Sequence, residues 1–194
     1  MVFNRVILGI CVWAVCAAAH GDRPTPRVDP ALVAALKQAV EDVRDTPEQL
    51  DTMVWLAKMS AGLASRIPDP FYRIHLLRMI YEEAGRADLD PELVLAVIHV
   101  ESGFDRFAVS PSGARGLMQI MPFWKKEIGH PDDNLFTPRT SLRYGCTILR
   151  YYLDLKRGKL AAALAAYNGS PDKKDYADKV YVALRDRWQP LVAK

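Results

Sequence analysis

The sequence has few cysteines and no recognisable metal-binding pattern. It contains three cysteines in 194 residues, and Cys11 and Cys16 lie in an apolar segment near the N-terminus. Without that segment only Cys146 remains, which can form neither an internal disulfide nor a cysteine metal site. The histidines are scattered and form no His-x-x-x-His pair: His20, His75, His99 and His130. We therefore expect no metal and no other cofactor.

A strong excess of one charge is also missing. The chain has 26 basic and 23 acidic residues, and loss of Arg5 with the N-terminal segment would leave 25 against 23. Proteins that bind nucleic acid neutralise several phosphates with clustered basic side chains. So mild a balance does not indicate a nucleic-acid partner.

The sequence lacks any sustained alternation of apolar and polar residues and any hairpin signal. Apolar residues instead recur at helical spacing, which predicts a mainly α fold with at most a small irregular β element after Glu101. Helices are expected in residues 71–85, 90–101, 138–156 and 159–168, with a short one in 123–128 and two more between residues 29 and 67. Cys146 falls on the apolar face of the 138–156 helix.

The N-terminal segment has the form of a secretory signal. Arg5 precedes an uncharged apolar run from Val6 to Ala19 that ends in three alanines. The run is too short for a comfortable membrane span, so we expect cleavage near Ala19 and a mature chain in the periplasm. An uncleaved anchor is one alternative. Lipidation of Cys16 is another, although Val15 is a poor match for the residue before a lipidated cysteine.

The next segment, residues 20–70, is expected to be an N-terminal helical arm and linker. Its two helices are predicted to form a hairpin, since Thr46-Pro47-Glu48 gives a helix-start signal between them. Pro68-Asp69-Pro70 interrupts the helical pattern, and we place the domain boundary there. Residues 71–194 then form the main domain. Nothing in the arm indicates chemistry, so it is either a structural support or a docking segment for a partner.

The most informative stretch is residues 90–119. Asp90 and Pro91 suit the start of a helix whose circumference is almost entirely apolar from Leu93 to Val100. Glu101 stands at its end, before Ser102-Gly103. Desolvation and the negative end of the helix dipole both oppose ionisation there, so its pKa should rise and the side chain can donate a proton near neutral pH. An ordinary solvated glutamate is the alternative.

The residues after Glu101 favour a binding site. Ser110-Pro111-Ser112-Gly113-Ala114 forms a small-residue loop, and Gly116-Leu117-Met118-Gln119 follows with an amide and a flexible apolar side chain. Together with Glu101-Ser102 and Ala166-Tyr167-Asn168, these four motifs resemble the family 1 soluble lytic transglycosylases. Those are cell-wall enzymes with an SLT domain similar to goose-type lysozyme.

The resemblance implies a lysozyme-like transglycosylase domain that acts on the glycan strands of peptidoglycan. In this family one glutamic acid cleaves the β-1,4 bond between N-acetylmuramic acid and N-acetylglucosamine, and 1,6-anhydromuramoyl products form without water. By position that acid is Glu101. Asp105 lies nearby but matches no second catalytic acid, whereas ordinary glycosidases use two carboxyl groups.

The resemblance also implies roles for other residues. Ser110 and Gln119 would hold the N-acetyl and sugar groups, and Met118 would form an apolar wall of the groove. Tyr167 would reach Glu101 through its hydroxyl, with Asn168 beside it in the site. Tyr144 is a weaker candidate for stacking on sugar, and Tyr176 fits the groove or the core equally well.

Two other functions stay open at this point. One is a hydrolytic muramidase of lysozyme type on the same fold, and the other is a non-catalytic subunit that only holds cell-wall glycan. A buried carboxyl is costly to keep in an idle groove, which argues against the second. The sequence leaves open whether cleavage occurs at chain ends or internally, whether the glycan must carry peptides, and whether the arm binds cell-envelope machinery.

Overall fold

The computed structural model describes residues 29–41, 47–170 and 174–189, all in helices and loops. The elements are α1 (Pro30–Glu41), α2 (Pro47–Leu63), α3 (Pro70–Arg86), α4 (Pro91–Glu101), α5 (Trp124–Ile128), α6 (Pro138–Leu155), α7 (Leu160–Tyr167), α8 (Asp175–Ala183) and the π-helix η1 (Leu184–Trp188). The expected mainly α fold is confirmed. Within the described ranges, β structure is limited to isolated bridges that join Arg115 to Val109 and to Ile120.

Helix α4 lies at the centre of the fold and has the predicted boundaries. The Asp90 side chain accepts a hydrogen bond from the Glu92 N–H at 2.8 Å, and Pro91 is the first helical residue. Residues 93–98 are all buried. Because α4 contacts α3, α8 and η1, its apolar circumference is covered by other helices rather than by water.

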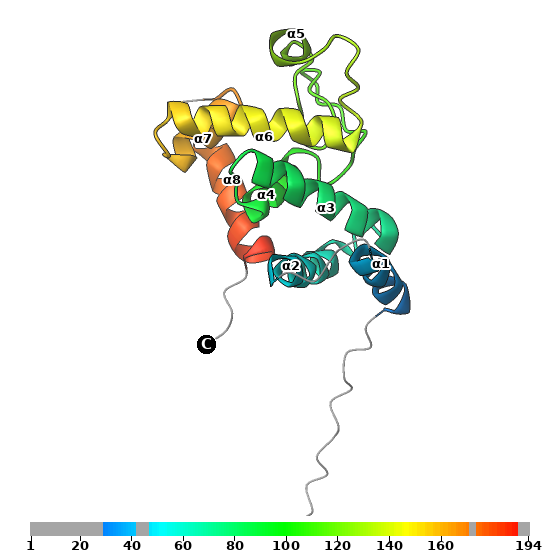
Figure 1. Cartoon of the computed structure of the whole chain (residues 1–194). Helices are drawn as coiled ribbons and strands as arrows, with labels where there is room; N and C mark the ends of the chain where they lie inside the picture. Colours follow the sequence, from blue (N-terminus) through cyan, green and yellow to red (C-terminus); the bar gives the residue numbers. More distant parts are fainter. Residues whose placement is uncertain (1–28, 42–46, 171–173, 190–194) are drawn as a thin grey trace, which may run out of the picture.

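Helix α3 lies between two layers, with α6 on one side and α1 and α2 on the other (Figure 1). Its contact with α6 includes Glu83, which is 1% exposed and pairs with Arg86, Arg139 and Arg143. Burial alone would raise the pKa of Glu83, but hydrogen bonds from Arg143 and Arg86 outweigh it and lower that pKa. The cluster therefore joins α3 to α6 through a buried carboxylate that stays charged.

The two N-terminal helices share the main core. Leu56, Met59 and Leu63 of α2 belong to the same buried cluster as α3 and α4. Buried Arg73 of α3 donates to the Ser60 hydroxyl at 2.8 Å and to the Ile67 carbonyl at 2.5 Å, so hydrogen bonds cross the predicted boundary at residues 68–70. These contacts show that α2 packs on the rest of the fold, while the division into an arm and a domain stays a prediction.

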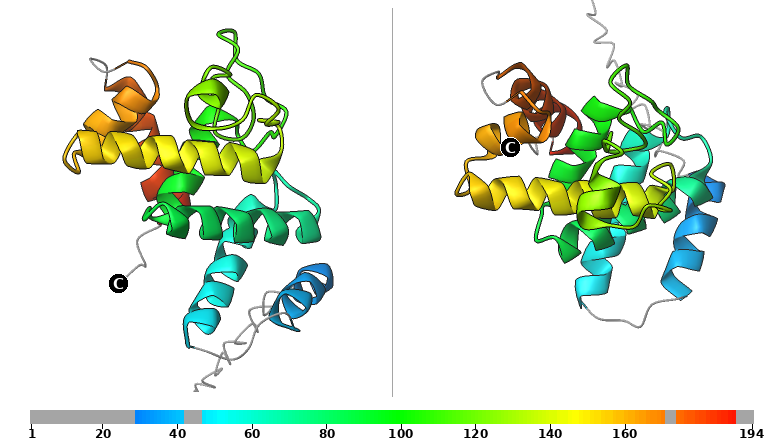
Figure 2. Two further views of the ribbon diagram at one scale, coloured as in Figure 1. Left: turned by 45° about the horizontal axis from the view of Figure 1, so that its top comes forward. Right: turned by 90° about the horizontal axis from the view of Figure 1, so that it is seen from above.

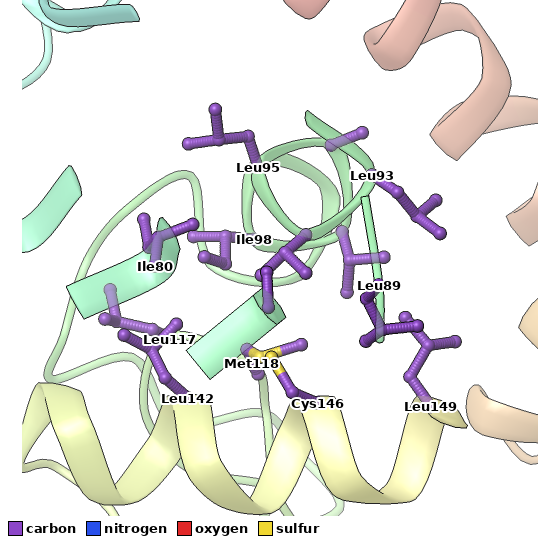
Figure 3. Close-up of a cluster of buried hydrophobic side chains, with 14 of the residues drawn as sticks. Ile80, Leu89, Leu93, Leu95, Ile98, Leu117, Met118, Leu142, Cys146 and Leu149 are labelled. Carbon is purple, nitrogen blue, oxygen red and sulfur yellow. The ribbon is translucent and has the colours of Figure 1, made fainter. Parts of the chain in front are cut away.

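The segment between α4 and α6, which includes α5, stands on the side of α6 away from α1 and α2 (Figures 1 and 2). Met118 from this segment reaches down between α4 and α6, where it lies beside Cys146 (Figure 3). It is fully buried, so the expectation that its side chain forms a groove wall is wrong. A flexible apolar side chain next to α6 fills core space instead.

The π-helix η1 closes the core around the end of α4. Trp188 is 2% exposed, and its ring packs edge-on against His99 and Phe104. His99 lies one turn before Ser102, and Phe104 follows the helix directly, so these rings hold the C-terminal end of α4. The apolar spacing in the sequence had indicated no separate element here.

Gly145 of α6 provides a test of the packing around Met118. A Cβ at Gly145 would lie less than 3.0 Å from three atoms of the Met118 side chain, whereas a Cβ at Gly85 of α3 would meet nothing within 4 Å. Gly145→Ala should destabilise the protein by about 1–3 kcal/mol through overpacking. The matched control Gly85→Ala should stabilise it by up to about 1 kcal/mol, because alanine favours a helix. Urea unfolding measures both, and a Gly145→Ala protein as stable as the Gly85→Ala protein would contradict this packing.

Candidate active site

Glu101 is the last residue of α4, and its side chain is partly buried. Ser102 ends the helix and its hydroxyl donates to the Leu117 carbonyl at 2.8 Å. The end of α4 is thus tied to the loop that carries the Gly116-Leu117-Met118-Gln119 motif. This bond explains why glutamate and serine occur together in the sequence: one side chain faces the site and the other fixes the loop beside it.

The Glu101 carboxyl accepts a hydrogen bond from the Tyr176 hydroxyl, with Oη and Oε1 2.6 Å apart. The expectation that Tyr167 makes this contact is wrong, because the Tyr167 hydroxyl donates to the Met118 carbonyl at 2.8 Å. Tyr176 is buried with Ala177 and Val180 on the face of α8 that packs on α4. A tyrosine on a buried helix face needs a partner for its hydroxyl. The position of Tyr176 on such a face could have identified it in the sequence as a residue with a buried hydrogen-bond partner.

Burial raises the pKa of Glu101 from 4.5 to about 7, and the hydrogen bond from Tyr176 acts in the opposite direction. Burial and the nearby Glu101 charge raise the pKa of Tyr176 well above 10, so the phenol keeps its proton and donates a hydrogen bond to the carboxyl. Glu101 can therefore carry a proton at neutral pH and also has a donor ready to stabilise its ionised form.

A pocket of about 180 Å³ opens in front of Glu101, and we call it the acid pocket. Four other predicted residues line it, namely Ser110, Gln119, Tyr167 and Asn168. The remaining lining residues had no predicted individual role, and they come from the loop after Ser110, from α5 and from α6: Ser112, Ala114, Ile120, Met121, Trp124 and Ile148. The pocket is smaller than the roughly 300–1,000 Å³ typical of small-molecule sites, so it suits part of a longer ligand.

Backbone geometry orients the loop side of the acid pocket. Gln119 has φ +50°, and its Nε2 donates to the Ala108 and Gly116 carbonyls at 3.1 and 2.9 Å. Gly116 also has a positive φ, and a Cβ there would collide with the Leu135 carbonyl. Since both Gln119 N–H bonds are used inside the loop, its Oε1 is the atom left to accept a hydrogen bond from a ligand.

Ser110 and Asn168 are also held by local hydrogen bonds. The Ser110 hydroxyl accepts from the Ala114 N–H at 3.0 Å and lies 2.9 Å from the Ser112 hydroxyl. After α7 the Ser170 hydroxyl donates to Asn168 Oδ1 at 2.7 Å. Two separate segments thus present polar groups of fixed orientation to the acid pocket.

Tyr144 lies outside the acid pocket. It is 6% exposed on α6, its hydroxyl donates to the Asp133 carboxylate, and it borders a different hollow together with Gly129 and Arg143. A Cβ at Gly129 would occupy the position of the Tyr144 hydroxyl, so the glycine lets the loop close over this ring. Its ring therefore cannot serve as a sugar platform in the acid pocket.

The part of the chain that the structure describes holds no group of three or more histidine, cysteine, aspartate or glutamate side chains that could bind a metal ion. In the same residues no helix is long and apolar enough to cross a bilayer. The candidate signal at residues 1–19 lies outside the described residues.

Comparison with known proteins gives a family. The sequence model of the Transglycosylase SLT domain matches residues 78–186, more than half of the chain. The transglycosylase of Enterobacteria phage PRD1 is 36% identical over 96 residues, 50% of this chain and 35% of its own length. Membrane-bound lytic murein transglycosylase C of Photorhabdus laumondii is 29% identical over 144 residues, 61% of this chain and 40% of its own length. The chain thus spans less than half of the length of each of these two relatives.

Among solved structures, the lytic transglycosylase Slt of Pseudomonas aeruginosa aligns with a TM-score of 0.46 and 22% identity, over 79% of this chain and 26% of that one. The family match begins at residue 78, inside α3, and leaves α1 and α2 uncovered. It includes every residue of the acid pocket and Tyr176.

The two tyrosines near Glu101 can be separated by their pH dependence. Tyr176→Phe removes the hydrogen bond that lowers the pKa of Glu101, so that pKa should rise further and the alkaline limb of the activity profile should move to higher pH. The bond also stabilises the carboxylate formed after proton donation, so activity should fall about 10- to 100-fold.

Tyr167→Phe is the matched control, since its hydroxyl bonds to the Met118 carbonyl and not to the carboxyl. It should leave the alkaline limb where it is in the wild type. Initial rates between pH 4 and pH 9 measure both variants. A limb that moves in Tyr167→Phe but not in Tyr176→Phe would contradict the assignment.

Proposed function

Because this chain belongs to the Transglycosylase SLT domain family, we propose that it is a peptidoglycan lytic transglycosylase. It cleaves the β-1,4 bond between N-acetylmuramic acid and N-acetylglucosamine and leaves a 1,6-anhydromuramoyl end. The observation that carries this proposal is Glu101, one carboxyl whose pKa of about 7 suits both the donation and the recovery of a proton.

The first step uses Glu101 in its protonated form. Its proton passes to the oxygen that joins the two sugars, the bond from that oxygen to C1 of the muramoyl residue breaks, and N-acetylglucosamine leaves as an alcohol. The N-acetyl group of the muramoyl residue stabilises the positive charge that develops at C1. The Tyr176 hydroxyl, 2.6 Å from Oε1, stabilises the Glu101 carboxylate as it forms.

The second step returns the proton. The Glu101 carboxylate takes it from the C6 hydroxyl of the same muramoyl residue, and O6 bonds to C1 to close the 1,6-anhydro ring. No water enters, and no second protein carboxyl is required because the substrate supplies the nucleophile. The partly buried position of Glu101 supports this cycle, since burial keeps either protonation state accessible near neutral pH.

The acid pocket supplies the groups that hold the substrate. Gln119 Oε1 is placed to accept the N–H of an N-acetyl group, while Ser110 and Asn168 offer polar contacts to sugar hydroxyls. Trp124 gives an aromatic surface for the apolar face of a sugar ring. Met118 and Tyr144 have no contact with substrate in this proposal.

The protein acts in the cell envelope, where its substrate lies. Relatives named membrane-bound lytic murein transglycosylases support that location. We further propose that residues 1–19 direct export to the periplasm and that the N-terminal arm contacts cell-envelope machinery. The exposed side chains of Leu50 and Val54 on α2 are the candidate contact.

Glu101→Gln tests the proposal. Glutamine keeps the size of the side chain but can neither give nor take the proton, so release of 1,6-anhydromuropeptides from purified sacculi should fall by at least about 10²- to 10⁴-fold. Asp105→Asn is the matched control, because Asp105 matches no second acid and its hydrogen bond from the Phe107 N–H at 2.8 Å can be kept by asparagine. It should retain activity near that of the wild type.

Stability provides a second readout for the same variant. The pKa of Glu101 is about 7 in the folded protein, compared with 4.5 in the unfolded chain. The folded state therefore binds more protons between these pH values, and wild-type stability falls as pH rises through them. Glu101→Gln should be more stable than the wild type at pH 8 and equally stable at pH 4.

In the cleavage experiment, near wild-type activity of Glu101→Gln would place the acid elsewhere. Products with free reducing ends from the wild type would indicate a hydrolytic muramidase.

A further inference from the structure

Glu101 borders a second hollow besides the acid pocket. This hollow runs along α8 and is lined by Val100, Glu101, Asn168, Ser170, Asp175, Tyr176 and Lys179. Val100 and Lys179 also line a third hollow, which continues toward η1 past Asp178, Asp186 and Arg187. We call these two connected hollows the α8 groove. Its start at Glu101 means that a ligand bound at the catalytic carboxyl can extend into it.

The acid pocket and the α8 groove differ in charge. The ionisable residues that line the acid pocket are Glu101 and Tyr167. The α8 groove instead presents charges of both signs along its length: Asp175, Asp178, Lys179, Asp186 and Arg187. A neutral sugar chain gains little from such a row of charges, so the groove suits a ligand that carries charges of its own.

Lys179 holds the central position in this row. It lines both parts of the α8 groove, and its side chain is exposed. Among the described residues no carboxylate lies within 4.0 Å of its amine, although Arg185 is paired with Asp186 further along. An amine without such a partner, in the same hollow as the catalytic carboxyl, is available to an anionic group of the substrate.

Peptidoglycan contains such a group. Its sugars are uncharged while the lactyl carboxyl of muramic acid is bound as an amide, and the stem peptide held by that amide carries free carboxylates and, through its diamino acid, an amino group. We propose that the α8 groove binds the stem peptide of the muramoyl residue and that Lys179 pairs with one of its carboxylates. This inference rests on the proposed transglycosylase function. The protein then recognises peptide-bearing glycan in preference to peptide-free glycan, and Lys179 determines that specificity without contacting the reacting atoms.

The test compares two substrates that differ only in the peptide. One is peptidoglycan with stem peptides, and the other is the same glycan after an amidase has removed them and the lactyl carboxylates that this frees have been converted to neutral amides. Lys179→Met should lower kcat/KM on the peptide-bearing substrate by roughly tenfold and leave the rate on peptide-free glycan unchanged. Lys58→Met is the matched control, because Lys58 is an exposed lysine of α2 on the far side of α3 from α6. It should change neither rate.

Binding provides a second readout that does not require turnover of peptide-free glycan. In the Glu101→Gln protein, adding Lys179→Met should weaken binding to peptide-bearing strands and remove most of its salt dependence, with no effect on peptide-free strands. An equal effect on both ligands, or no effect on the peptide-bearing one, overturns the inference. A wild-type protein that cleaves neither substrate instead contradicts the proposed function, so the two failures are distinguishable.

Discussion

The proposed chemistry depends on one carboxyl, that of Glu101, which the fold holds partly out of water at the end of a buried helix. Residues 93–98 of α4 are fully surrounded, so Glu101 emerges from the core and not from a surface helix. Desolvation favours its protonated form, while the Tyr176 hydroxyl at 2.6 Å favours the ionised one. The balance leaves both states within reach at neutral pH, which is what a single group needs if it is to give and then recover a proton.

Much of the remaining structure keeps this carboxyl in place. Trp188 packs against His99 and Phe104 on either side of the helix end, and Ser102 binds the Leu117 carbonyl. Buried Glu83 holds α6 against α3, and Ser141 of α6 supports the loop beside Glu101 because its hydroxyl accepts a hydrogen bond from the Met118 N–H at 3.1 Å. The acid pocket and the α8 groove then meet at a residue that has little freedom to move.

The sequence allowed prediction of the features that depend on local patterns. The capping residues gave the start of α4 correctly, and its apolar run indicated a buried helix with a perturbed acid at its end. The errors concern contacts between distant segments. The packing of α7 and α8 decides that Tyr176, and not Tyr167, reaches Glu101. Met118 enters the core because Gly145 leaves space for it. The charge contrast of the α8 groove likewise appears only after α4 and α8 come together.

The most direct test of this account is the ionisation of Glu101 itself. The side-chain carboxyl carbon can be followed by ¹³C NMR as pH is varied, and the signal missing from the Glu101→Gln protein identifies it. That assignment matters because burial also raises the pKa of Glu92, at the opposite end of α4, to about 7. The account predicts a midpoint for Glu101 of about 7, and a midpoint near the ordinary value of 4.5 would contradict it.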